Sequence, residues 1–258
     1  LVTIAVLPMM SCAGRLPIYM MFVSALFPSR LQAPVLFGIY ASGVLLALCC
    51  ARLLKNTLFK APQRDSLHHM KRLRLPSLRK VGILMWSRAF MYVRKAGTFI
   101  LGASIILWFL NTYPRPEENT APTNAAAMEH SYAGQIGHWM EPVTQVAGFD
   151  WKINSALVGA FAAKEIFVTQ MGILYAVEDG NSGPAAQQTL NARLKASYTP
   201  LQGISIMIFC LIALPCIGTV TVAKREAGTW WFALAQFGGL TLLGFATATL
   251  IYQAGLLL

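Results

Sequence analysis

Sulfur-bearing side chains lie beside a predicted break in the apolar sequence near the start of the chain. The stretch PMMSCAGRLP at residues 8–17 holds two thioethers, a hydroxyl and the thiol of Cys12. Each proline lacks the backbone N–H and clashes with the preceding turn, so Pro8 and Pro17, with Gly14 between them, predict a broken helix. At membrane depth, irregular backbone is tolerated where protein or a water-filled cavity surrounds it, which indicates a lined site. The alternative is a kink packed by small residues, with Cys12 as a buried hydrophobe.

A second stretch near the other end of the chain is similar. LPCIGT at residues 214–219 again places Pro215, Cys216 and Gly218 inside an apolar run. Paired interrupted hydrophobic segments are the best sequence pointer to the binding site of a transporter. We therefore expect Cys12 and Cys216 to lie in two related broken helices.

Lys164 and Glu165 carry the most costly charges within the apolar sequence, in a stretch at residues 153–176 that predicts a membrane crossing. Small and polar residues recur around Glu165 at spacings of three and four, which predicts a face that packs closely against other helices. We expect Glu165 to face protein or a cavity, with Arg15, Lys164 or a transported cation as its partner. The alternative is a structural ion pair.

The composition excludes an ordinary soluble domain. Of the 258 residues, 56% are hydrophobic and 12% charged, and the mean hydropathy is +0.54. This indicates an integral membrane protein with an all-α polytopic fold, since apolar helices of about 20 residues span a bilayer. The five cysteines all lie in apolar runs without framework spacing, so no disulfide scaffold is expected.

The positive charge marks one side of the membrane. Residues 52–95 hold twelve Lys or Arg and one acid, whereas residues 115–150 hold five acids and one base. Basic loops stay on the cytoplasmic side and also attract anionic lipid headgroups. No nucleic-acid motif accompanies the basic residues, so nucleic acid is not an expected partner.

The predicted fold has about five long membrane helices, two interrupted helices around a shared cavity, and one interfacial helix. The segments expected to be helical are 16–27 as a half-helix, 35–54, 81–108, 133–146 at the interface, 153–176, 200–213 and 230–254. Residues 177–199 are expected to form an internal polar loop. Counting crossings places Lys224 and Arg225 outside, against the positive-inside rule, unless the second broken segment is re-entrant; both options stay open.

Two residue pairs that contain histidine are weaker candidates for function. His68 and His69 are adjacent, so their side chains point apart and a metal site is disfavoured. His138 and Glu141 are three residues apart and are expected to form a solvated pair. The chain begins at Leu1 without a signal peptide and is expected to be a segment of a longer protein.

Several motifs together resemble a known family. They are the PMMSCAGRLPIY at 8–19, KAGT at 95–98 leading into SIILWFL at 104–110, AKE at 163–165, and PCIGT at 215–219 followed by KRE at 224–226. In order and spacing they resemble the bacterial ferrous iron transport protein B, in which a cytoplasmic GTPase domain precedes a membrane domain with two Gate repeats. One departure is SCAGR where that family more often has SCGAR, which shifts where the backbone can take positive φ.

The resemblance implies a domain organisation and a function. Residues 1–54 would hold the end of the first Gate repeat and the next transmembrane helix, 55–80 a basic cytoplasmic connection, and 81–258 the second Gate region with an external loop at 113–150. The implied function is Fe²⁺ permeation across the bacterial inner membrane. The chain has no G-x-x-x-x-G-K-[ST] motif, so no enzyme activity or cofactor is expected in this segment, and GTP with Mg²⁺ is implied only for the missing GTPase domain.

The resemblance also implies a metal pathway. Cys12 and Cys216 are the family's candidate thiol ligands in the two Gates, and Glu165 and Met10 would complete a transient Fe²⁺ site. These donors would accept zinc, manganese or cobalt as well, so the choice of iron rests on the resemblance. Further implied partners are the GTPase domain of the same protein, small accessory iron-transport proteins and a second copy of the chain. The alternative functions are an organic-solute or nucleoside-type Gate carrier and a non-transporting membrane anchor that responds to a GTPase domain.

Overall fold

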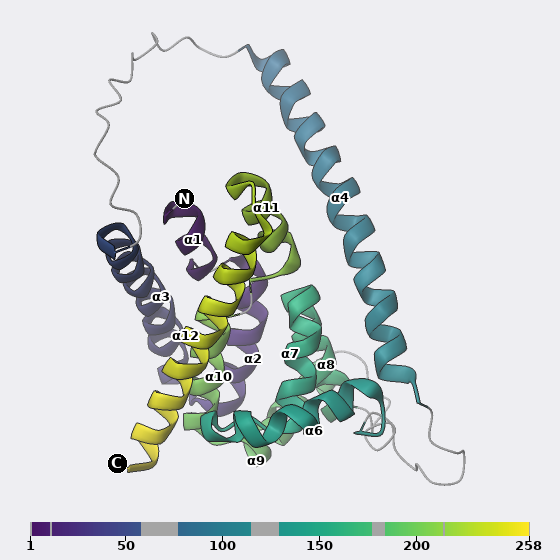
Figure 1. The fold of residues 1–258 in the computed structure, drawn as a ribbon. Coiled ribbons are helices and arrows are strands. Elements are labelled where there is room, and N and C mark those ends of the chain that lie inside the picture. The colour runs from purple at the N-terminus through teal and green to yellow at the C-terminus, as the bar shows by residue number, and fades with distance from the viewer. Residues whose placement is uncertain are drawn as a thin grey trace.

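The computed structural model describes residues 2–10, 12–57, 77–114, 129–176, 184–213 and 215–257. Every regular element in these ranges is a helix, which confirms the predicted all-α class (Figure 1). Three described segments are long and apolar enough to cross a membrane: Ser29–Thr57, Pro200–Ala227 and Trp230–Leu257. His68, His69 and most of the basic connection lie outside the described residues.

The first predicted break is present. The chain runs from α1 (Val2–Val6) through two short 3-10 helices, η1 (Leu7–Met9) and η2 (Ala13–Arg15), into α2 (Leu16–Leu26). Pro8 lies inside η1, and Met10 has extended backbone with φ −70° and ψ 134°. α2 is the expected half-helix, and after Pro28 the chain reverses into α3 (Ser29–Thr57).

The second predicted break is also present. α10 (Pro200–Ile212) stops before Ala213, Cys216 has extended backbone, and α11 (Ile217–Ala227) follows. Gly228 has φ +73°, in the left-handed region that glycine adopts most easily, and turns the chain into α12 (Trp230–Leu257). The end of α12 returns to the start of α10, since a Cβ on Gly255 would meet Leu201.

The predicted crossing at residues 153–176 is wrong, because this segment is a helical hairpin. α7 (Trp151–Ala162) and α8 (Lys164–Ala176) are separated by Ala163, whose backbone is extended with φ −151° and ψ 132°. Close packing of the two arms brings Ile166 so near Gly159 that a Cβ there would lie 2.9 Å from its Cγ2. The segment therefore enters the helical bundle and turns back.

The two ends of this hairpin are joined by hydrogen bonds through one tyrosine. The Tyr198 hydroxyl donates to the Asp150 carboxylate at 2.8 Å and accepts from the Tyr175 hydroxyl at 3.0 Å. Asp150 precedes α7 and Tyr175 lies in the last turn of α8, so both arms start and finish on the same side. The hairpin is re-entrant.

The re-entrant hairpin decides the orientation of Lys224 and Arg225, which the sequence left open. The end of α3, the start of α4 (Leu78–Thr112) and the end of α11 lie at one end of the molecule, here called the basic end (Figure 1). Lys55, Lys80, Lys224 and Arg225 therefore share one side, as the positive-inside rule requires. Because residues 153–176 do not cross, the chain makes one crossing fewer before α10, and the crossing count now agrees with the positive-inside rule for Lys224 and Arg225. The second broken segment is not re-entrant, because α10 and α11 together run from the opposite end of the molecule to the basic end.

The opposite end, here called the acidic end, holds two shorter helices (Figure 1). The first is α6 (Tyr132–Thr144), followed by η3 (Gln145–Ala147), which agrees with the interfacial helix expected at 133–146. The second is α9 (Pro184–Ser197), where a polar loop was expected on the internal side, so that expectation was wrong in both structure and location. α9 packs against α2 and α8.

Candidate functional site

Three helix breaks meet at one junction in the bundle. A Cβ built on Gly14, in the first break, would lie 2.8 Å from Oε1 of Glu165 and 3.8 Å from Cβ of Lys164, at the hairpin tip. The Lys164 ammonium in turn lies 3.4 Å from the backbone oxygen of Cys210, in the last turn of α10 before the second break. The re-entrant tip thus touches both broken helices, and we call this meeting point the junction.

Arg15 holds the first break together. Its guanidinium donates to the backbone oxygens of Pro8 at 2.6 Å, Met10 at 3.1 Å and Met9 at 3.4 Å, and the residue is 1% exposed. Carbonyls freed from helical hydrogen bonding cannot find water inside a bilayer, so an internal donor must satisfy them. From the sequence, Arg15 was expected as a possible partner of Glu165, but no salt bridge joins the two side chains in the described structure.

Lys164 plays a related part at the second break. It is 7% exposed, and its ammonium lies within electrostatic range of Arg15 and of the thiols of Cys12, Cys210 and Cys216. Lys164 and Glu165 are neighbours whose side chains leave the helix in different directions, which explains why Lys164 does not pair with Glu165. The junction therefore contains two buried cations, Arg15 and Lys164, with three cysteines in their neighbourhood.

The predicted metal ligands lie around this junction with different exposures. Cys12, Met10 and Glu165 are exposed in this chain, and Cys216 is half-buried. The Cys216 thiol lies 3.2 Å from the Thr219 hydroxyl one turn along α11. No three His, Cys, Asp or Glu side chains among the described residues form a ready-made metal cluster, so the four-ligand set stays a prediction.

The expected small and polar stripe around Glu165 is interrupted. Because the helix breaks at Ala163, Ser155 is buried in α7 whereas Glu165 and Thr169 are exposed on α8. One face of the Glu165 carboxylate nevertheless lies against Gly14. The third break was not predicted from the sequence, where the Lys-Glu pair inside an apolar run is the signal for it.

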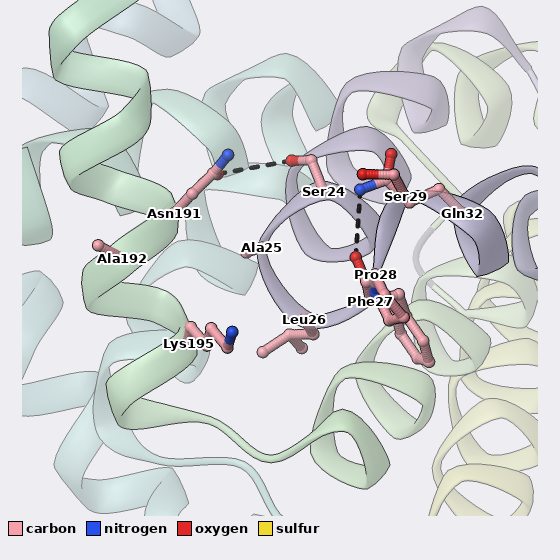
Figure 2. Close-up of a pocket in the computed structure, with 10 residues that line it drawn as sticks. All are labelled: Ser24, Ala25, Leu26, Phe27, Pro28, Ser29, Gln32, Asn191, Ala192 and Lys195. Atoms are coloured by element: carbon pink, nitrogen blue, oxygen red, sulfur yellow. Dashed lines mark hydrogen bonds between the residues drawn. The ribbon is translucent and has the colours of Figure 1, made fainter.

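The other candidates lie away from the junction. His138 on α6 has Nδ1 3.2 Å from Glu141 and Nε2 3.6 Å from Glu129, and all three are partly exposed, which confirms the expected solvated pair. A cavity of about 350 Å³ lies at the acidic end, between the α2–α3 turn and α9 (Figure 2). Ser24 and Asn191 face each other across it, and it includes no residue of the junction.

Fold and junction together define a class: a multi-pass helical membrane protein in which broken helices meet around a polar point. Two family models match this chain. One, described as nucleoside recognition and named Gate, matches residues 93–230, and one described as the C terminus of ferrous iron transport protein B matches residues 36–88. The chain belongs to the ferrous iron transport protein B family, as part of its membrane domain, and is a multi-pass protein of the bacterial inner membrane.

Curated relatives agree along nearly the whole chain. The Fe(2+) transporter FeoB of Campylobacter jejuni is 36% identical over 92% of this chain and 39% of its own length. A fusion of Fe(2+) transport protein A with FeoB from Porphyromonas gingivalis is 34% identical over 100% of this chain and 34% of its own length. FeoB of Helicobacter pylori strain 26695 is 30% identical over 98% of this chain and 44% of its own length. The chain thus spans less than half of each relative, and no solved structure matches it.

Proposed function

We propose that this chain forms part of the Fe²⁺ pathway of a ferrous iron uptake transporter, and that the metal passes at the junction. The observation that carries the proposal is the meeting of three helix breaks beside the thiols of Cys12 and Cys216 and the carboxylate of Glu165. The names of the relatives, all Fe(2+) transporters, support iron as the substrate.

The chemistry of the junction suits a passing ion. Thiolate, thioether and carboxylate groups each replace part of the hydration shell of Fe²⁺. Because no preformed cluster of three His, Cys, Asp or Glu side chains is present among the described residues, the ion would meet its ligands a few at a time. Conduction requires weak, exchanging contacts of this kind rather than a closed cage.

The arrangement of the chain supports further parts of the proposal. Residues 1–54 would complete the first Gate repeat, 55–80 would connect on the cytoplasmic side, and 81–258 would hold the second Gate region. The basic end would face a GTPase domain of the same protein, which would bind GTP and Mg²⁺. The natural fusion of transport protein A with FeoB in Porphyromonas gingivalis supports a small accessory protein as a partner.

Iron uptake in iron-deficient cells tests the metal pathway. In the intact transporter at equal protein levels, Cys12→Ser and Cys216→Ser are each expected to lower uptake severalfold, because an alcohol is a poorer ligand than a thiolate. Cys49→Ser is the matched control, since this thiol is exposed on α3 and is not part of the segments that form the three breaks. Full uptake by both junction variants would remove the thiol pathway.

A nucleoside or other organic solute is the second candidate cargo, favoured by the description of the Gate family model. Such a carrier would be inhibited by competing nucleosides and indifferent to the loss of Cys12 or Cys216. A membrane anchor without transport would pass no metal into liposomes under any nucleotide condition. The same cysteine variants, assayed with and without nucleosides, separate these possibilities from iron permeation.

A further inference from the structure

Lys164 is a buried cation for which iron permeation by itself provides no role. It lies at the tip of the re-entrant hairpin, 7% exposed, with its ammonium 3.4 Å from the backbone oxygen of Cys210. The thiols of Cys12, Cys210 and Cys216 lie within electrostatic range of this ammonium. A positive charge is therefore already in place where the metal is proposed to pass.

We propose that Lys164 is a tethered cation that holds the place of the metal ion. In the structure its ammonium rests against the end of α10, and it would move aside when Fe²⁺ reaches the thiols. This inference rests on the proposed function, because it assigns a built-in competitor to the same pathway. Lys164 is thus a positioning residue and not a metal ligand.

The end of α10 is a favourable place for positive charge. The last carbonyls of a helix have no intrahelical partners, and the helix dipole places partial negative charge there. α10 ends at Ile212, so the oxygen of Cys210 belongs to this terminal group. The break in the second helix therefore creates a cation-binding position, and in the structure Lys164 occupies it.

Of the two buried cations at the described junction, Lys164 is the more weakly held. Among the described residues, three backbone oxygens hold the Arg15 guanidinium, whereas one hydrogen bond of 3.4 Å holds the Lys164 ammonium. A lysine also has a flexible four-carbon stem and three rotatable donors. Arrival of a doubly charged ion beside two cations would drive away the more weakly held one.

The expected consequence is weaker metal binding and faster metal release. A cation that competes for the junction raises the metal concentration needed to occupy it and promotes release of the bound ion. Conduction needs both properties, because an ion that binds too tightly does not leave. Removing the charge should therefore tighten binding and slow transport together.

The test uses Lys164→Gln, which removes the charge but keeps a donor for the oxygen of Cys210. The matched control is Lys164→Arg, which keeps the charge. The intact transporter in nanodiscs is titrated with Fe²⁺ under anaerobic conditions, and protection of Cys12 and Cys216 from a maleimide is measured. Initial rates of Fe²⁺ uptake into liposomes give the apparent KM and maximal rate of each variant.

Lys164→Gln is expected to lower the Fe²⁺ concentration for half-protection by at least roughly tenfold, because at an effective dielectric of about 20 a unit charge a few ångströms away repels the ion by more than that factor. Its apparent KM and its maximal rate should both fall, and Lys164→Arg should resemble the wild type. A purely structural role predicts weaker protection in Lys164→Gln, and that result or an unchanged titration overturns the proposal. Wild-type thiols that Fe²⁺ never protects would overturn the metal pathway itself, whereas normal wild-type protection with no effect of Lys164→Gln would overturn only the role of Lys164.

Discussion

Contact between Gly14 and Glu165 is the geometric basis of the junction, and a single methyl group tests it. A Cβ at position 14 would lie 2.8 Å from Oε1 of Glu165. Favourable contacts between heavy atoms lie near 3.5 Å, so Gly14→Ala requires a displacement of roughly 0.5 Å or more. Gly14 lies in η2 and has no positive φ, so alanine meets no backbone penalty there.

The cost should be modest and should depend on Glu165. Overpacking typically costs about 1–3 kcal/mol, and the lower end applies because a flexible carboxylate can shift. Replacing glycine also stabilises by about 0.4–1 kcal/mol through the unfolded chain, which partly hides the clash. A double-mutant cycle with Glu165→Ala removes this background, and we expect a coupling of about 1 kcal/mol between the two positions.

The assay is equilibrium unfolding of the intact transporter in mixed detergent micelles containing SDS. Gly172→Ala is the matched control, because a Cβ at Gly172 on α8 would meet nothing within 4 Å. This control should stabilise by about 0.5–1 kcal/mol in either background. Equal effects of Gly14→Ala with and without the Glu165 carboxylate would refute the contact, and with it the convergence of the first break and the hairpin tip.

Two further predictions concern topology and pH. Because the α7–α8 hairpin is re-entrant, Ser197→Cys on α9 should react with an impermeant maleimide in intact spheroplasts. Glu226→Cys on α11 should react only after the spheroplasts are permeabilised. The reverse pattern would mean that residues 153–176 cross the membrane. Burial raises the pKa of the Asp150 carboxyl, although the N–H of Ile153 and the hydroxyl of Tyr198 that donate to it act in the opposite direction. Because its pKa is raised, the Asp150 carboxyl binds its proton more tightly in the folded state than in the unfolded state. The stabilisation by the protonated carboxyl is therefore complete below the ordinary Asp pKa of about 3.9 and is lost as the pH rises through the raised pKa. Asp150→Asn keeps the helix N-cap and should lack this decrease; parallel unfolding-versus-pH curves for the two proteins would contradict the assignment.

Local chemistry was sufficient to predict the two outer breaks. Proline removes a backbone donor, and Pro8 and Pro215 both lie where a helix is interrupted. Pro34 and Pro142, by contrast, lie inside α3 and α6, so the glycine and the cysteine near Pro8 and Pro215 were part of the signal. The boundaries of α2 and α10 were predicted to within one residue for the same reason. The all-helical class followed from composition, because inside a bilayer the backbone N–H and C=O groups must form their hydrogen bonds within the protein.

The third break, at Ala163, could not be predicted from the residues around it. Residues around Ala163 include no proline, and alanine, lysine and glutamate favour helix, so a continuous crossing was the natural prediction. In the fold, the Lys164 ammonium binds the end of α10 and the Glu165 carboxylate lies against Gly14. Both contacts are with residues distant in sequence.

The sequence by itself determined that this chain lies in a membrane, which segments are apolar, and where two prolines and the basic residues occur. Only the tertiary structure decided that residues 153–176 turn back, that Lys224 and Arg225 therefore share a side with the basic segment, and that Arg15 and Lys164 serve the breaks and not Glu165. The physical reason is that a backbone carbonyl freed inside a bundle is satisfied by whichever donor packing brings to it, and spacing along the chain does not specify that donor.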